Sequence, residues 1–324
     1  MPGLTRRTVI SLSGAILVAS QARANTDYPN RAVRTVVPFP PGGTTDVIGR
    51  IIAEDLGMEL GQSFYIDNRG GAGGTLGADV VAKSKPDGYT LLIFHSGLTY
   101  GPALFKHLNY DVLKDFTPIS LLGVAPSVLV ITPSLPFRSV ADLIAAAKKD
   151  PGEINYGTAG VGSSSHLAVE LFQSVTGVKV THVPFRGGGP SVMAVIGGQV
   201  QFMIETAGSL MQQIQSGTLR PLAVTSEARL PELPSVPTMR EAGLSNYVYS
   251  TWYGLFGPAA MDPAIIESLN KACAKSSVKA EVKAKLANAG IDAAASSSAQ
   301  FATIIRDDLD KWTKIIHAAG IQPQ

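Results

Sequence analysis

The sequence predicts an α/β protein built from two facing halves, and two observations carry this prediction. Runs of β-forming residues alternate with helical periodicity along most of the chain, which indicates a parallel sheet with helices on both faces. A unit of strand, glycine-rich turn and helix occurs at residues 35–60 and again at residues 153–176. About 300 residues follow the N-terminal segment, enough for two domains of ordinary size.

The first unit, residues 35–60, begins with β-forming residues that three prolines end. Gly42 and Gly43 supply the turn, and apolar residues at three- and four-residue spacing from position 47 to 56 predict a helix. Thr44 or Thr45 is the expected N-cap. Unpaired N–H groups at such a helix start form a ready anion site, although an ordinary strand–helix connection explains the pattern equally well.

The second unit places a small-residue turn, residues 158–162, before a helix that opens with three serines and His166. The serines are either hydrogen-bond donors to a ligand or simple structural caps. Neither unit continues with the Gly-Lys-Ser/Thr of a P-loop, so a nucleoside triphosphate is not expected. Two such loops suggest a ligand held between two halves.

Residues 1–24 have the pattern of an export signal, with Arg6-Arg7, an apolar run and a small-x-small site ending at Ala24. The paired arginines leave Sec and twin-arginine export both open. The apolar run is too short to span a bilayer, so we expect cleavage after Ala24 and a periplasmic protein without membrane insertion.

The composition is that of a globular protein, with 45% apolar and 16% charged residues. The net charge of +2 falls to near neutral without the signal, and no basic patch indicates nucleic-acid binding. Residues 71–76 lack the last glycine of the dinucleotide-binding motif G-x-G-x-x-G, so no cofactor is expected. The five histidines do not have the spacing of metal ligands, so no metal is expected. The lone Cys273 is expected to be a buried structural thiol.

The domain organisation follows from two stretches where the chain is expected to cross between halves. Residues 122–129 lead into a β run at 128–132, and residues 247–255 predict a strand that returns to the first half. We therefore expect a discontinuous first domain, residues 25–125 plus 247–324, and a second domain, residues 126–246.

Two side chains and one serine cluster are the candidates for chemistry. Arg186 is a carboxylate clamp or a surface charge, and Glu205 is an acceptor for a ligand hydroxyl or amine or a structural neighbour of a helix start. Serines beside His166 raise a periplasmic serine hydrolase as an alternative, but no G-x-S-x-G elbow is present and adjacent residues rarely give nucleophile–base geometry. We therefore expect no enzyme activity.

Several motifs together resemble the extracytoplasmic solute receptors of the tripartite tricarboxylate transporter system, the Bug-type family. They are PFPPGGTTD at 38–46, Asn68-Arg69 with GAGG at 71–74, PDGYT at 86–90, and YGTAG at 156–160 with Gly162-Ser163 and His166. The resemblance spans the chain beyond the signal. It implies a periplasmic binding protein-like fold of type II, with two doubly wound α/β domains joined by two crossing strands and closing on a hinge.

The resemblance also implies that one small organic carboxylate, a di- or tricarboxylate or an aromatic acid, is held between the lobes and delivered to a large and a small permease subunit. The receptor is expected to be a monomer; a ligand-sensing subunit of a signalling system is the other alternative. Gly70 and Glu205 depart from the family's usual proline and aspartate, which puts the usual dicarboxylate preference in question. The expected ligand-binding residues are Phe39, Pro41, Gly42, Gly43, Thr44, Asp46, Ser96, Thr158, Ala159, Ser163, Ser164, His166, Phe185, Arg186, Gly187 and Glu205.

Overall fold

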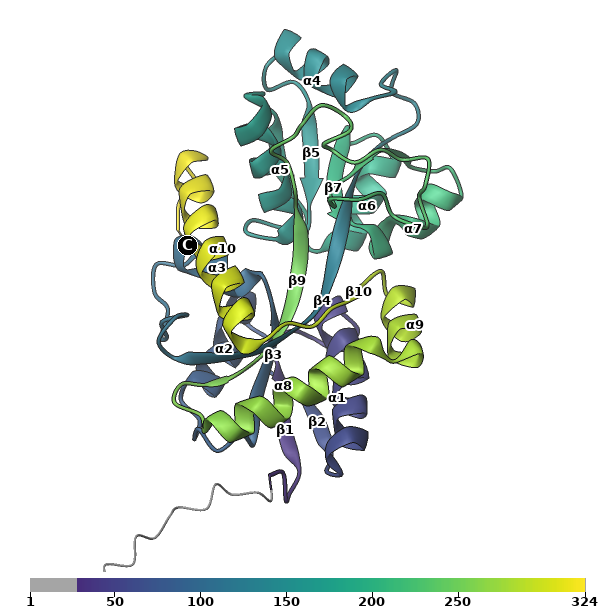
Figure 1. Cartoon of the computed structure of the whole chain (residues 1–324). Coiled ribbons are helices and arrows are strands. Elements are labelled where there is room, and N and C mark those ends of the chain that lie inside the picture. Colours follow the sequence, from purple (N-terminus) through teal and green to yellow (C-terminus); the bar gives the residue numbers. More distant parts are fainter. Residues whose placement is uncertain (1–27, 324) are drawn as a thin grey trace, which may run out of the picture.

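The computed structural model describes residues 28–323, so the export signal expected at residues 1–24 lies outside the described part of the chain. The chain forms two α/β lobes, one above the other, around a shared sheet (Figure 1). The elements are β1 (Val33–Val37), α1 (Thr44–Leu60), β2 (Phe64–Asn68), η1 (Ala72–Gly74), α2 (Thr75–Ala82), β3 (Thr90–His95), α3 (Gly97–Leu104), β4 (Phe116–Ile131), α4 (Val140–Lys149), β5 (Asn155–Thr158), α5 (Ser164–Thr176), β6 (Thr181–Pro184), α6 (Gly188–Ile196), β7 (Phe202–Thr206), α7 (Ala207–Gln215), β8 (Arg220–Val224), β9 (Ser250–Pro258), α8 (Pro263–Val278), α9 (Ala280–Asn288), β10 (Asp292–Ala293) and α10 (Ser298–Ala318).

The sheet is mixed, with the expected parallel pairing confined to the outer strands of each lobe. Its strand order is β2-β1-β3-β9-β4-β7-β5-β6, with β8 and β10 also pairing with β4. The outer strands of each lobe pair in parallel, as the alternating strand–helix pattern requires. The two strands between them, β9 and β4, pair antiparallel with each other and with their neighbours β3, β7 and β8.

The long strand β4 belongs to both lobes. Its residues from Phe116 to Pro126 pair with β9, and from Ser127 to Ile131 they pair with β7. The sequence predicted only the second part, at 128–132, because Pro118, Gly123 and Pro126 interrupt the β-forming pattern before it. Antiparallel pairing tolerates these residues here through irregularities in the register with β9.

Helices cover both faces of the sheet in each lobe, as the fold class requires. In the first lobe one core joins α1, α8 and α9 to the sheet, and a second core lies beneath α2 and part of α10. In the second lobe α6 and α7 cover one face, and α4 and α5 cover the other. Cys273 lies on the buried face of α8, which confirms the expected buried thiol.

The C-terminal helix α10 connects the lobes a third time. It runs from the first lobe up along the second (Figure 1), and its Trp312 ring contacts the rings of Tyr100 and Tyr249. Trp312 and Ile316 are buried in the same core as α5 of the second lobe. Hydrophobic packing therefore holds the lobes together alongside β4 and β9.

Side chains cap α4 and α8 but not α1. Ser139 and Asp142 form a capping box at α4, and Asp262 caps α8. Helix α1 begins after Gly43, and neither Thr44 nor Thr45 caps it, so that expectation was wrong. Both threonines already have helical positions, which leaves their side chains beyond the N-cap geometry.

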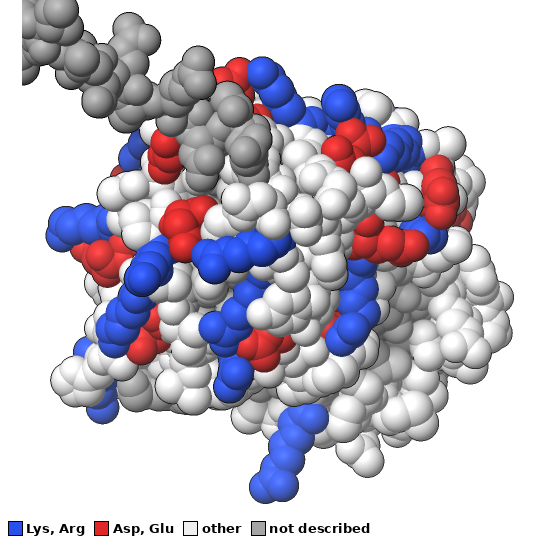
Figure 2. Space-filling model, turned by 90° about the horizontal axis from the view of Figure 1, so that it is seen from below, with Lys and Arg blue, Asp and Glu red and all other residues white. Residues whose placement is uncertain are grey.

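Charged side chains of both signs alternate on the face of the first lobe seen in Figure 2. Within residues 28–323, no helix has the length and apolar character to cross a membrane. The same residues contain no cluster of three or more histidine, cysteine, aspartate or glutamate side chains placed to hold a metal ion.

Candidate functional site

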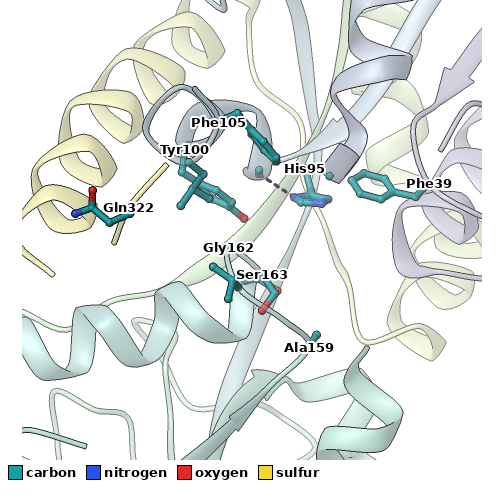
Figure 3. A pocket seen from close by; sticks show the side chains of 13 residues that line it. Phe39, His95, Tyr100, Phe105, Ala159, Gly162, Ser163 and Gln322 are labelled. Atoms are coloured by element: carbon teal, nitrogen blue, oxygen red, sulfur yellow. Dashed lines mark hydrogen bonds between the residues drawn. The ribbon is translucent and has the colours of Figure 1, made fainter. Parts of the chain in front are cut away.

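A pocket of about 420 Å³ lies between the lobes, a volume within the usual range of small-molecule sites. Figure 3 shows side chains from both lobes converging on it. The first lobe contributes three segments around β1, η1 and α3, and the second contributes the loop between β5 and α5. The lining residues are Phe39, Gly73, His95, Gly97, Tyr100, Leu104, Phe105, Ala159, Val161, Gly162, Ser163, Ser164 and Gln322.

The loop between β1 and α1 is held from behind by Asp46. Its carboxylate is buried and accepts hydrogen bonds from Gly42 N (2.9 Å), Arg50 Nε (2.9 Å) and Asn68 Nδ2 (2.9 Å). Burial alone would raise the pKa of this carboxyl, but these hydrogen bonds outweigh it and lower the pKa. Asn68 also donates to the carbonyl of Phe39 at 2.9 Å, so the network fixes the residue that enters the pocket.

The same loop leaves amides free at the start of α1. Among the hydrogen bonds of the described residues, the N–H groups of Gly43, Thr44 and Thr45 donate to none. Pro41, Gly42 and Gly43 are exposed. An exposed helix start with unpaired amides has the features of the anion site that the sequence predicts, and Phe39 of the same loop lines the pocket.

The loop between β5 and α5 differs because its own side chains occupy most of its amides. Ser163 caps α5 by accepting from His166 N (3.3 Å) and donates to Gly160 O (2.7 Å). Ser165 Oγ accepts from Ala159 N at 3.0 Å, and His166 Nδ1 accepts from Gly162 N at 3.1 Å. This loop is therefore a rigid wall of the pocket.

A buried cluster of rings and one acid supports that wall. The rings of His166 and His182 are stacked, with centroids 4.0 Å apart, and Thr158 Oγ1 lies 2.6 Å from His182 Nε2. Tyr156 Oη donates to Glu170 Oε1 at 2.6 Å, and His166 Nε2 lies 3.5 Å from the same oxygen. Burial and the neighbouring His166 lower the pKa of His182 to about 4, so its imidazole is neutral at pH 7.

Three aromatic residues that line the pocket were not predicted from the sequence: His95, Tyr100 and Phe105. His95 is the most informative of them. Its Nδ1 accepts a hydrogen bond from Gly97 N at 2.8 Å (Figure 3). Burial lowers its pKa to about 4, so at pH 7 the neutral ring carries its proton on Nε2. Tyr100 lies in α3 and Phe105 directly follows it. The sequence did not predict this helix. Position at the carboxyl end of a β-strand was the signal available for His95.

The structure brings four of the sequence-predicted site residues into the pocket lining: Phe39, Ala159, Ser163 and Ser164. The others lie around it. Pro41, Gly42, Gly43, Thr44 and Asp46 form the loop before α1, Thr158 and His166 support the wall, and Phe185, Arg186 and Gly187 precede α6. Ser96 is buried, with its Oγ 3.4 Å from Tyr100 Oη. Arg186 is exposed and forms no ion pair within the described residues.

Glu205 lies at the end of β7, only 7% exposed. Its Oε1 accepts from Thr206 N at 2.8 Å, and a Cβ on Gly188 would lie 3.6 Å from its Oε2. Burial raises the pKa of this carboxyl, partly offset by hydrogen bonds from Thr206 and Ser165. Its carboxylate therefore faces the start of α6 close behind the serines of the pocket.

The serine–histidine cluster lacks the geometry of a hydrolase within the described residues. Both ring nitrogens of His166 are directed at Gly162 N and Glu170, and no serine hydroxyl is hydrogen-bonded to either. Ser163 and Ser165 are hydrogen-bonded to each other at 3.1 Å. The arrangement binds and positions, and it provides no nucleophile–base pair.

Two α/β lobes joined by crossing strands, with a pocket between loops of both, define a solute-binding receptor of the periplasmic type. The chain belongs to the tripartite tricarboxylate transporter family of receptors, whose family description matches residues 48–321. It is 39% identical to Protein BugT of Bordetella pertussis over 305 residues, covering 94% of this chain and 93% of that one.

Two solved structures share the fold closely. "R. palustris Rpa4515 with adipate" is 37% identical, with a TM-score of 0.80 over 92% of this chain and all of that one. "MatC (Rpa3494) from Rhodopseudomonas palustris with bound malate" is 32% identical, with a TM-score of 0.75 over 89% of this chain and all of that one. The resemblance in the loop and turn motifs is thereby confirmed at the level of family and fold.

Proposed function

We propose that this receptor captures a small organic carboxylate in the pocket between its lobes and delivers it to the permease subunits of a tripartite transporter. The observation that carries the proposal is the pocket itself, which is lined by His95 from the first lobe and by the capped loop before α5 from the second. The free amides at the start of α1 follow Phe39, which also lines the pocket, and support an anionic ligand. Relatives with bound adipate and malate support a carboxylate as the ligand class.

Closure on the ligand requires two bodies, and the strand pairings support the expected division. The pairing partner of β4 changes from β9 to β7 between Pro126 and Ser127, close to the expected domain boundary at 125/126. We propose residues 25–125 plus 247–324 as one body and 126–246 as the other, with hinges at 122–129 and 247–255. Ligand-driven closure then follows from tighter binding to the closed arrangement.

We infer further that the protein is exported, cleaved after Ala24, acts in the periplasm as a monomer and catalyses no reaction. Within residues 28–323 no serine hydroxyl is hydrogen-bonded to a ring nitrogen of His166, which supports the last point against a serine hydrolase. A role as a signalling subunit predicts capture of a kinase ectodomain, and the transport role predicts capture of the permease pair.

The test is a thermal-shift screen of residues 25–324 against mono-, di- and tricarboxylates, followed by titration calorimetry of each hit. A ligand at a hundred times its dissociation constant adds about 2.7 kcal/mol to the free energy of unfolding. Stabilisation by at least one carboxylate is the expected result. A protein freed of co-purified ligand that no carboxylate stabilises would contradict the proposal.

A further inference from the structure

The first-lobe side of the pocket is a preformed aromatic slot. The rings of Phe39 and His95 are stacked, with centroids 4.8 Å apart and planes 23° from parallel. Glycines allow the neighbouring rings to pack close to the backbone, because a Cβ on Gly73 would lie 2.7 Å from Phe105 Cζ and one on Gly74 would lie 2.7 Å from Phe94 Cζ. Rings packed in this way offer a flat ligand stacking surfaces without an ordering cost.

The charge distribution around the slot suits a ligand with a single negative charge. Among the residues described, none that lines the pocket is lysine, arginine, aspartate or glutamate. Two buried acids lie behind the second-lobe wall, Glu170 and Glu205. Glu170 accepts a hydrogen bond from Tyr156 and lies beside His166, whereas no lysine or arginine is paired with Glu205 in the described chain. A second carboxylate directed at that wall would meet a charge of its own sign without a buried cation to offset it.

One donor in the slot is already directed for a carboxylate. His95 Nδ1 accepts a hydrogen bond from Gly97 N, so the ring carries its proton on Nε2. Because the ring lines the pocket, Nε2–H is available as a donor to a ligand. Nε2 has no hydrogen-bond partner among the described residues, and Figure 3 shows the ring between Phe39 and Tyr100. The Tyr100 hydroxyl points into the same space. An anion bound to Nε2–H therefore has aromatic rings on its flanks.

We propose, resting on the carboxylate-receptor function above, that the ligand is an aromatic monocarboxylate of one or two rings, whose carboxylate is bound by His95 Nε2–H and whose ring lies against Phe39. Glu205 is the residue that disfavours a second carboxylate. This assignment narrows the ligand from organic acids in general to those with a flat apolar body.

The first experiment uses the unaltered mature protein and a panel of probes: benzoate and 2-naphthoate, cyclohexanecarboxylate, adipate and malate, and benzamide. Calorimetry at pH 8 should show at least ten-fold tighter binding of one aromatic monocarboxylate than of adipate, malate or benzamide. Tighter binding of adipate or malate would overturn this inference and leave the carboxylate-receptor function standing. Failure of every acid to bind would overturn both.

The second experiment assigns the residues. His95→Phe keeps a ring and removes the donor, so affinity for the best aromatic acid should fall about 10- to 100-fold, the usual effect of a hydrogen bond to a charged group. Phe39→Leu should weaken it about three- to ten-fold through lost stacking. His107→Gln, at an exposed histidine, and Phe137→Leu, in the second lobe, are the matched controls and should leave affinity within two-fold.

The third experiment tests the charge. Glu205→Gln keeps the shape of the side chain and removes its charge, so adipate should bind at least five-fold more tightly while the aromatic acid changes less than two-fold. Equal effects of Glu205→Gln on adipate and on the aromatic acid would overturn the assignment. So would a His95→Phe protein that is folded by circular dichroism and binds the aromatic acid as tightly as the unaltered protein.

Discussion

The loops before α1 and α5 have similar sequences but differ in the side-chain capping of the helix that follows. Both follow a strand, contain two or more glycines and open a long helix. The loop before α1 has no side-chain cap, and the amides of Gly43, Thr44 and Thr45 donate to no partner among the described residues. Before α5, Ser163, Ser165 and His166 accept from three amides, while those of Val161, Ser164 and Ser165 donate to none of the residues described. The difference between the two loops is therefore the side-chain cap, which α1 lacks.

The difference shows that a glycine-rich turn before a helix does not by itself define an anion site. The side chains at the start of the helix decide. Asp46 and its counterpart in α5, His166, each accept the amide of the residue four positions earlier, Gly42 and Gly162. Ser163 and Ser165 accept two further amides, those of His166 and Ala159, and α1 has no such cap. Each loop can be altered separately to test this contrast.

The largest effect is expected at Asp46, which holds the open loop. Asp46→Ala should lower the free energy of unfolding by about 2 to 3 kcal/mol, because Gly42 N and Asn68 Nδ2 lose a buried acceptor. It should also weaken carboxylate binding by displacing Phe39. Urea denaturation measures the first effect and calorimetry the second.

The pH dependence provides the internal check on Asp46. Its folded pKa lies below the ordinary value of 3.8, so its contribution is complete above that pH and disappears as the pH falls through the folded pKa. The stability difference between the two proteins should therefore shrink in that range. Asp150→Ala, at an exposed acid, is the control; an Asp46→Ala protein as stable as this control would contradict the prediction.

The next effect compares one glycine from each loop. Gly42 and Gly162 both have positive φ, +85° and +75°, so alanine strains either by about 1 kcal/mol. A Cβ on Gly42 meets nothing within 4 Å, but one on Gly162 would lie 2.8 Å from Leu104 Cδ1 of the other lobe. Gly162→Ala should therefore cost about 2 kcal/mol in unfolding free energy and Gly42→Ala about 1 kcal/mol.

A double-mutant cycle shows whether Leu104 is the cause. In a Leu104→Ala background, the cost of Gly162→Ala should fall by at least about 0.5 kcal/mol because the contact is removed. Costs that simply add would place the strain elsewhere.

A smaller effect is expected from the cap. Ser163→Ala removes the N-cap of α5 and should cost about 1 kcal/mol, whereas Thr44→Ala at the uncapped α1 should cost no more than about 0.5 kcal/mol. Thermal unfolding of both variants, with Ser163→Thr as a variant that retains the cap, measures the difference. Equal losses at Ser163 and Thr44 would remove the contrast between the loops.

The smallest effect concerns the ring cluster behind the wall. His182 has a folded pKa of about 4, below the ordinary 6.5, so the unfolded chain binds more protons in this range and stability falls as the pH falls below about 6.5. Because the ring is only partly buried, we expect about half a kcal/mol between pH 7 and 6. His182→Asn should flatten this slope, and an unchanged slope would assign it to other groups.

Much of the fold was predictable from local patterns, and the exceptions have a common cause. The parallel outer strands follow from periodicity and from the prolines and glycines between elements. The first part of β4 and the helix α3 were missed because Pro118, Pro126 and Pro102 contradict local propensity. Long-range pairing with β9 and burial of Tyr100 against Trp312 override that propensity.

The site was predictable only where the chain itself forms a loop. Phe39 and the serines of α5 lie in turns that the sequence marks clearly, and both line the pocket. His95 and Phe105 are ordinary aromatic residues of a strand end and a helix end, so only the packing of the lobes reveals them as lining. The free and occupied states of the two loops likewise depend on side-chain geometry that no spacing rule encodes.

The sheet of the first lobe cannot be completed until the second lobe has been synthesised, because β9 follows the second lobe in the chain. β4 receives its partner β9 only after the whole second lobe has been made, and Thr117 and Pro258, joined by a hydrogen bond, are 141 residues apart in the chain. Until then the nascent β3 and β4 have unpaired edges, and the loop-closure entropy of bringing β9 to them is still unpaid. The first lobe therefore completes its sheet last although it begins first, and until β9 has been made these edges are open to aggregation.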